Sequence, residues 1–287
     1  MSPSPALIAV IGPVEPDLLT SWIAHYRQLG IERFQLGFHF PDHVPTARRH
    51  ELQAAVREAG VIPQGTSHGP WHEHTNTQIR DTLRRQAGPG WHLLADADEF
   101  HQYPAPLSEI TARADQRGNS VVGGLLLDRV AADGRLIDWT ATGSLDVAYP
   151  LGGHLSHRLL HADPRKIVLA RHDVRVASGN HRAPGHRPDS GHLAAVHHFK
   201  WRTGVVEDLR RRVHHFRSGL WQEQSTAVRE EADRFLTHLT RYHGVINVAD
   251  PHLTFRRVTL EHLPVHWLTE AHAIHAAWKP PTPAARG

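Results

Sequence analysis

Residues 91–100 read Trp-His-Leu-Leu-Ala-Asp-Ala-Asp-Glu-Phe, an apolar run that ends in three carboxylates. A short apolar run of this kind is typical of a buried strand, so Asp96, Asp98 and Glu99 are expected at a strand's carboxyl end. In open α/β sheets ligands bind at that edge, and two aspartates one residue apart can hold a single Mg²⁺ or Mn²⁺ ion. The stretch therefore predicts a metal site that receives a phosphate; the plainer alternative is a solvated acidic turn.

Strand and helix patterns alternate along the chain before this stretch. Apolar runs closed by Gly or Pro predict the strands, and apolar residues at helical spacing predict the helices. The strands are expected at 6–11, 33–38 and 61–63, and the helices at 16–29, 46–59 and 75–86. This alternation predicts an α/β fold with a mostly parallel central sheet flanked by helices.

The second half of the chain predicts a less regular arrangement. The expected elements are a helix at 107–117, a strand at 121–127 that ends in Asp128, a hairpin-like pair at 166–170 and 174–177, a strand at 192–201, and helices at 203–218 and 222–243. Alternation along 192–201 places His198, Lys200 and Arg202 on one face and Phe199 and Trp201 on the other. One face is therefore cationic and the other is packed.

Composition narrows the class of protein. The 287 residues are 40% apolar and include no long linker, so one domain with additions is expected. There is no cysteine, the start lacks the positive segment of a signal peptide, and no apolar run is long enough to span a bilayer, so a cytoplasmic protein is expected. The 27 histidines are dispersed, and the net charge of +3 does not predict nucleic-acid binding.

Residues 96–100 resemble the Asp-x-Asp-Glu-Phe signature of family 2-like glycosyltransferases. Similarity extends to 19–31, which resemble the family's first helix, and to 178–182 and 197–202, which resemble its later Gly-x-His and His-Phe/Tyr segments. The resemblance covers residues 6–245 and implies a GT-A fold that holds a nucleotide sugar through a divalent metal. It implies a nucleotide-sugar-binding and catalytic domain at 1–202 and a helical extension of that domain at 203–278, while composition predicts a disordered tail at 279–287.

The resemblance implies roles for the polar residues near the predicted sheet edge. Asp96 and Asp98 would bind Mn²⁺ or Mg²⁺, with His198 as a further ligand. A nucleotide-sugar donor, expected to be a UDP-sugar, would be contacted by Glu15, Asp42, Glu99, Lys200 and Arg202. One departure concerns the base-recognition end: family members carry Asn-Glu just after the first strand, and this chain has Gly12-Pro13-Val14-Glu15.

Transfer with inversion needs a base that takes the acceptor's proton. Asp128 is one candidate because of its predicted strand-end position. His181 is the other, because it lies in a Gly-flanked loop that resembles the family's Gly-x-His segment. No spacing argument chooses between them.

The expected function is metal-dependent sugar transfer to a glycan or small natural product. A nucleotidyltransferase acting on sugar phosphates is an alternative, although no Gly-rich triphosphate loop lies near residue 12. A phosphatase that places Asp-x-Asp after its first strand is disfavoured, because here the motif follows the fourth. A non-catalytic nucleotide- or anion-binding module also stays open.

Overall fold

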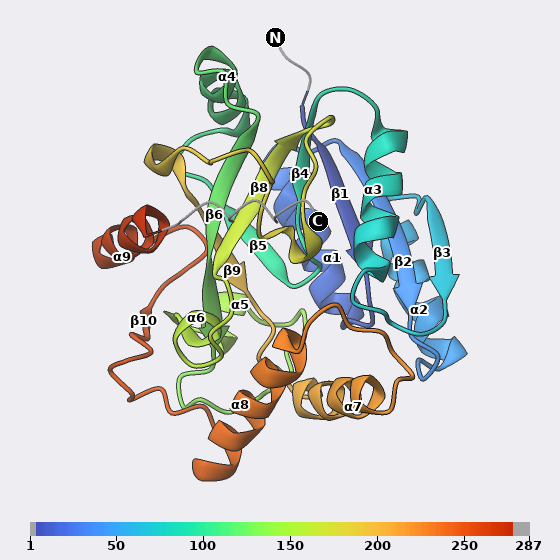
Figure 1. Cartoon of the computed structure of the whole chain (residues 1–287), viewed down its shortest axis with the longest axis vertical. Coiled ribbons are helices and arrows are strands. Elements are labelled where there is room, and N and C mark those ends of the chain that lie inside the picture. Colours follow the sequence, from blue (N-terminus) through green and yellow to red (C-terminus); the bar gives the residue numbers. More distant parts are fainter. Residues whose placement is uncertain (1–3, 278–287) are drawn as a thin grey trace, which may run out of the picture.

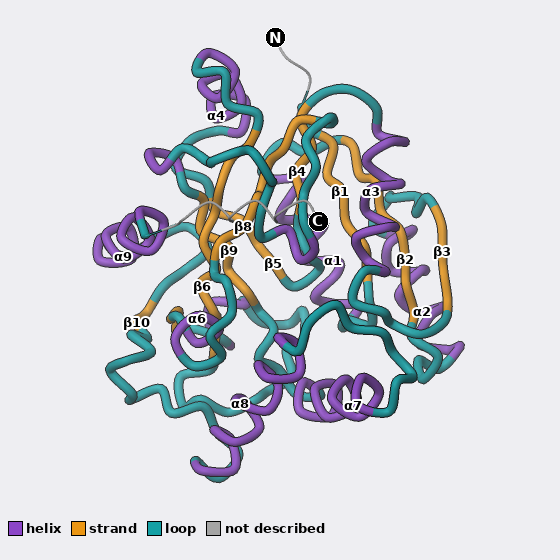
Figure 2. The backbone as a smooth tube through the Cα atoms, in the orientation of Figure 1, coloured by secondary structure: helices purple, strands orange, loops and turns teal. Residues whose placement is uncertain are grey.

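A computed structural model describes residues 4–277 of the chain. Within them lies a ten-stranded sheet with the strand order β10-β7-β6-β8-β4-β1-β2-β3, and β9 pairs with both β5 and β6 (Figures 1 and 2). The strands β1, β2, β3, β4, β6, β9 and β10 share one direction, and β5, β7 and β8 oppose it. The predicted fold class, an α/β fold with a mostly parallel central sheet flanked by helices, is therefore confirmed. The predicted tail at 279–287 lies outside the described residues.

The first half of the chain builds the parallel part of the sheet. Its elements are β1 (Ala6–Ile11), α1 (Pro16–Gln28), β2 (Arg33–Phe40), α2 (Thr46–Glu58), β3 (Gly65–His68), α3 (Thr75–Ala87) and β4 (Trp91–Leu94). The predicted third strand at 61–63 was wrong. Val61 instead closes the end of α2 by donating its N–H to Val56, and pairing with β2 begins at Gly65.

Side chains of β1 divide between two cores because successive residues of a strand point to opposite faces. Leu7, Ala9 and Ile11 pack with the apolar faces of α1 and α2. Ala6 and Ile8 pack on the other face with Leu83 and Ala87 of α3. The sheet is thus covered on both faces, which leaves its carboxyl edge as the place where polar side chains collect.

The second half of the chain adds the mixed part of the sheet. Its strands are β5 (Glu99–Gln102), β6 (Val121–Val130), β7 (Leu151–Gly153), β8 (Arg165–Arg171), β9 (Ala194–His198) and β10 (Arg256–Arg257), and its helices up to β9 are α4 (Leu107–Gln116), α5 (Leu145–Ala148), α6 (Leu155–Arg158) and the 3₁₀ turns Ser178–Asn180 and Ser190–His192. Because β6 continues to Val130, Asp128 lies within a strand and not at its end, which corrects its predicted position.

The hairpin predicted at 166–170 and 174–177 was also wrong. β8 pairs with β4 and β6, and 174–177 is an irregular segment. Its carbonyl groups are satisfied by side chains from α3, since Arg84 donates to Val174 and Arg80 donates to Val176 and Ala177. Two buried guanidinium groups therefore replace the ladder that a hairpin would have supplied.

Three helices follow β9: α7 (Val205–Arg217), α8 (Ala227–Arg241) and α9 (Val265–Ala276). Since β1 runs downward from the N-terminal end in Figure 1, the carboxyl ends of the parallel strands face α7 and α8 at the bottom. Trp201 packs on Phe235 of α8 with ring centroids 4.4 Å apart, which joins these helices to the end of β9. The helical extension predicted after residue 202 therefore begins beside the candidate site. In the described part of the chain, no helix is long and apolar enough to cross a membrane.

The connection between α7 and α8 is tied to the loop before α3. Glu73 donates its backbone N–H to Gln222 at 2.9 Å, and Gln222 donates its own to Nδ1 of His72 at 2.9 Å. The Trp71 and Trp221 rings lie edge to face with centroids 5.9 Å apart. These contacts fix the two helices over the sheet edge.

We predict that Gly134→Ala destabilises the fold by roughly 2 to 4 kcal/mol, because a β-carbon there would meet the carbonyl oxygen of Ile246 and the residue has φ +74°. The close approach is structural, since the Ile246 N–H donates to Gly134 at 2.8 Å. Chemical denaturation measures the effect. Gly143→Ala is the control, because nothing lies within 4 Å of the β-carbon it adds; equal losses in both variants would contradict the prediction.

Candidate functional site

The acidic stretch forms a tight turn between β4 and β5. The Glu99 N–H donates to the carbonyl oxygen of Asp96 at 3.0 Å, and the Glu99 carbonyl accepts hydrogen bonds from the Trp22 indole at 2.9 Å and the Tyr26 hydroxyl at 3.0 Å. The side chains of Asp96 and Asp98 are 48% and 23% exposed, whereas that of Glu99 is 2% exposed. The backbone of the turn is therefore held by α1, while both aspartates can reach a ligand.

His198 lies between two strands that bring it to this turn. In β9 it pairs with Glu99 of β5 on one side and with Asp128 of β6 on the other. Its Nδ1 donates to Oδ1 of Asp128 at 3.1 Å, and its Nε2 lies 3.9 Å from Oδ2 of Asp98. Burial lowers the pKa of His198, but the hydrogen bond to Asp128 and the charge of Asp98 outweigh it and raise the pKa above its ordinary value.

Asp128 is buried and accepts hydrogen bonds from three other donors. Ser156 donates its backbone N–H at 2.6 Å and its hydroxyl at 2.7 Å, and the Trp201 indole donates at 2.9 Å. Burial would raise the pKa of Asp128, but these bonds and His198 hold it below its ordinary value. In this structure Asp128 orients His198; its predicted role as catalytic base stays a prediction.

Two cations stand beside Asp98. The Lys200 amine lies 5.1 Å from the centroid of the Trp201 ring and makes no hydrogen bond or ion pair with any residue in 4–277. Burial and the charge of Arg212 lower its pKa, and the charges of Glu231 and Asp98 oppose that effect. Arg202 pairs with Glu15 at 2.9 Å through Nη2, while its Nη1 is buried without a hydrogen-bond partner among the described residues. Burial would raise the pKa of Asp98, but His198, Arg202 and Lys200 hold it low.

His181 lies in the turn that follows the irregular segment at 174–177. Its Nδ1 donates to the carbonyl oxygen of Arg165 at 2.9 Å, and its ring stacks against Gly179, where an added β-carbon would meet it. Burial and the charge of Lys166 lower the pKa of His181 to about 4. The imidazole is therefore neutral at pH 7 with its proton on Nδ1, and the lowered pKa means that protonation of Nε2 is disfavoured.

The structure brings together most of the residues predicted for the site, from segments far apart in the sequence. Glu15, Asp96, Asp98, Glu99, Asp128, His198, Lys200 and Arg202 form one group, linked by the contacts above and, for Lys200 and Arg202, by the effect of their charges on the pKa of Asp98. Asp42 is exposed in the loop after β2 and makes no hydrogen bond or ion pair with the described residues. Its role in binding the nucleotide stays a prediction.

Sequence reasoning missed Lys166, which lies at the centre of the group. Its amine contacts Oε1 of Glu99 at 2.6 Å, Oδ2 of Asp96 at 3.3 Å and the carbonyl oxygen of Gly179 at 2.8 Å. A signal was present: the chain has only three lysines among its 32 lysine and arginine residues, and one of them directly precedes the apolar residues 167–170. A charge at the start of a buried strand predicts a specific partner.

The residues present fit a divalent cation held by few protein ligands. No group of three or more His, Cys, Asp or Glu side chains within 4–277 forms a ready-made metal cage. Asp98 and His198 approach each other with the facing atoms Oδ2 and Nε2, and Asp128 orients the imidazole as carboxylates commonly do for a metal-binding histidine. Mg²⁺ is typically held by one or two carboxylates together with the phosphates of a substrate, which suits this arrangement.

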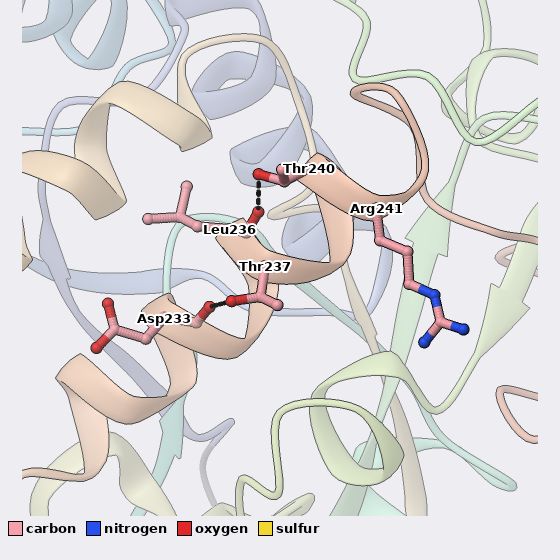
Figure 3. A pocket seen from close by; sticks show the side chains of 5 residues that line it. All are labelled: Asp233, Leu236, Thr237, Thr240 and Arg241. Atoms are coloured by element: carbon pink, nitrogen blue, oxygen red, sulfur yellow. Dashed lines mark hydrogen bonds between the residues drawn. The ribbon is translucent and has the colours of Figure 1, made fainter.

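A hollow of about 500 Å³ lies along α8 (Figure 3). It is lined by Asp233, Leu236, Thr237, Thr240 and Arg241 of that one helix. The hydroxyls of Thr237 and Thr240 donate to carbonyl groups of their own helix at 2.7 and 2.9 Å. None of the residues predicted for the site lines it, and the hollow shows no arrangement of facing polar groups.

No protein-family profile matches the chain, and no protein of curated function matches it in sequence. Among solved structures, S. aureus TarS 1–349 is similar with 12% identity and a TM-score of 0.31 over 82% of this chain and 72% of that chain. A Bacillus anthracis protein described as a glucose-1-phosphate thymidylyltransferase, in complex with sucrose, has 9% identity and a TM-score of 0.31 over 96% and 97%. A UDP-glucose pyrophosphorylase complexed with UDP-glucose has 7% identity and a TM-score of 0.29 over 82% and 99%. At these values there is no residue-by-residue correspondence.

We predict that Asp163→Asn lowers stability at pH 7 by about 2 kcal/mol. Burial would raise the pKa of Asp163, but hydrogen bonds from Arg165 and the charges of His181 and Arg165 lower it to about 2. A depressed carboxyl pKa stabilises the fold above the unfolded-state value near ~3.9 and loses that contribution as the pH falls toward 2. Denaturant titrations from pH 7 to pH 3 should show the two proteins converging in acid; a constant gap would contradict this.

Proposed function

We propose that the chain is a metal-dependent glycosyltransferase that moves a sugar from a nucleotide-sugar donor, a UDP-sugar, to a glycan or small natural-product acceptor. The observation that carries the proposal is the meeting of Asp98 and His198 beside the amine of Lys200, which is unpaired among the described residues. Two cation ligands and an available positive charge at one sheet edge suit a diphosphate bound together with a metal ion. The resemblance of residues 96–100 to the glycosyltransferase signature supplies the reaction class.

In this proposal Oδ2 of Asp98 and Nε2 of His198 hold Mn²⁺ or Mg²⁺. When bound, the cation neutralises the charge that grows on the departing nucleoside diphosphate. Asp128 keeps a proton on Nδ1 of His198, so that the neutral imidazole would present the Nε2 lone pair to a cation. Asp96, also predicted as a ligand, directs Oδ2 to Lys166.

Lys200 and Arg202 supply the positive charge that one divalent ion leaves uncompensated. Lys200 is free of ion pairs with the described residues, and Nη1 of Arg202 has no partner among them. Glu15 fixes the orientation of Arg202 by accepting from its Nε at 3.1 Å and its Nη2 at 2.9 Å. Asp42, at the carboxyl end of β2, is proposed to contact the base or ribose.

His181 and Asp128 stay the two candidate bases. The Nδ1 hydrogen bond of His181 leaves its Nε2 unprotonated, but burial and the charge of Lys166 lower its pKa to about 4, which makes it a weak proton acceptor at pH 7. Asp128 is buried and already accepts from Ser156, His198 and Trp201. The proposal therefore keeps both residues as candidates for proton transfer and also gives Asp128 the orientation of the metal ligand His198.

We predict that Mn²⁺ strengthens binding of UDP at least tenfold over binding in EDTA, and that Asp98→Asn abolishes this gain because it removes an anionic ligand. Calorimetry measures both effects, and circular dichroism checks the fold of the variant. Asp173→Asn is the matched control, since Asp173 is exposed in the turn after β8. Equal affinity for UDP in Mn²⁺ and in EDTA would contradict the proposal that a metal ion takes part in UDP binding.

Turnover separates this reaction class from its alternatives. A glycosyltransferase consumes UDP-sugar and releases UDP when an acceptor is supplied. A nucleotidyltransferase would instead release pyrophosphate from a nucleoside triphosphate and a sugar phosphate. A non-catalytic module would bind UDP and convert neither pair, so retained UDP binding without turnover by any donor and acceptor pair would exclude the proposal.

Lys200→Ala is predicted to weaken UDP binding by roughly 1.5 to 3 kcal/mol while leaving uridine binding nearly unchanged, because a charge-assisted contact to the diphosphate is lost. Calorimetric titration with both ligands measures the difference. Arg210→Ala on the exposed side of α7 serves as the control. Equal affinity of Lys200→Ala and the parent for UDP would show that Lys200 does not contact the diphosphate.

A further inference from the structure

Lys166 is a cation placed inside the acidic site by the fold itself. Its side chain is 5% exposed, and its amine lies between Glu99, Asp96 and the carbonyl group of Gly179. An ammonium group has three N–H donors, and these three acceptors satisfy them all. No donor is left to bind a ligand, so the partners of Lys166 are residues of the chain.

The position of Lys166 is set by the strand pairing around it. β8 lies between β4, which leads into the acidic turn, and β6, in which Gly124 pairs with Lys166. Gly179, its third partner, lies in the turn whose neighbouring residues Ala177 and Asn180 are held by Arg80 of α3. The amine is therefore fixed from two directions and cannot move away from the carboxylates without breaking these contacts.

Lysine is a rare choice of cation in this chain. Arginine outnumbers it so far that only Lys166, Lys200 and Lys279 occur in the sequence, yet two of the three lie at this one site. The ammonium group is a compact point charge, whereas the planar guanidinium group prefers two-pronged contacts. A compact charge fits among three oxygens from three different residues.

A nucleophilic role for Lys166 does not fit its surroundings. Burial would lower its pKa, but Glu99 and Asp96 outweigh burial and raise it above the ordinary value. The amine is therefore protonated and has no lone pair with which to attack a sugar or a phosphate. What it offers to the site is a permanent positive charge.

We propose that Lys166 is a resident counter-cation that offsets one of the two negative charges of Asp96 and Glu99, so that a divalent metal binds weakly by itself and tightly only together with a nucleoside diphosphate. This inference rests on the proposed function for the identity of the diphosphate. Asp98 and His198 are then the protein's free ligands, and the phosphate oxygens complete the metal's coordination. Replacing both Lys166 and Glu99 by neutral residues would remove the positive charge without leaving an unpaired buried charge. Asp96 could then bind the metal, and metal binding would depend less on the nucleoside diphosphate.

The test uses Mn²⁺ alone, followed by the electron paramagnetic resonance signal of the free ion. In Lys166→Met/Glu99→Gln the buried pair is replaced by neutral groups, and the amide oxygen introduced at position 99 can still accept from the Asp96 N–H, as Glu99 does at 3.2 Å. We expect this double variant to bind Mn²⁺ about tenfold more tightly than Glu99→Gln alone, because a positive charge has left the site. Adding Asp96→Asn to the double variant should cancel the gain in Mn²⁺ affinity. Lys166→Arg/Glu99→Gln keeps the positive charge at position 166 and should show no gain.

The parent protein supplies a second test that needs no variant. UDP should tighten its Mn²⁺ binding at least tenfold, by the reciprocity of coupled binding. Equal Mn²⁺ affinity with and without UDP in the parent would overturn the proposal, and so would equal affinity of Glu99→Gln and the double variant. If these binding results appear as expected while no sugar is transferred, the proposed function fails and the role of Lys166 stands.

Discussion

The pairing of β9 with β5 on one side and β6 on the other is the constraint on which the site depends. That register sets His198 opposite both Glu99 and Asp128 and brings the end of β9 to the acidic turn. The backbone ladder, and not any side-chain contact, thus decides which groups meet. A slip of one residue would turn His198 and Lys200 away from the carboxylates and expose Phe199.

The parallel half of the fold could be predicted from the sequence because its signals are local. The bounds of β1 are those of its apolar run, and α1 ends one residue before the predicted helix end. Both predictions depend only on the types of residues close together in the sequence. The mixed half was less predictable. The segment 174–177 was predicted as a strand but is irregular, because its carbonyl groups accept hydrogen bonds from Arg80 and Arg84. These arginines lie some ninety residues earlier, so no local sequence pattern predicts the contacts.

The candidate site shows the same division between local and distant signals. The acidic residues and the cationic residues His198, Lys200 and Arg202 were visible in the sequence, and the structure brings them together, although the strand predicted at 192–201 is confined to Ala194–His198 and Lys200 and Arg202 follow it. The surroundings were not visible: Asp128 looked like a free strand-end carboxylate, yet Ser156 and Trp201 satisfy it. Trp22 of α1 donates to the backbone of the acidic turn, a contact that helical spacing alone does not predict. Burial and hydrogen-bond satisfaction are properties of the folded chain, so sequence patterns alone do not assign them.

The contacts of Trp201 link segments that are synthesised at different times. Its indole binds Asp128 on one side and packs on Phe235 of α8 on the other. During synthesis, the strand that carries Asp128 leaves the ribosome well before Trp201 and Phe235. The Asp128 carboxylate therefore lacks its Trp201 hydrogen bond until the later segment has been made. The packing around Trp201 is therefore complete only after α8 has been translated, and a nascent chain released at residue 202 would hold every residue proposed to bind the metal but lack the Phe235 ring against which Trp201 packs.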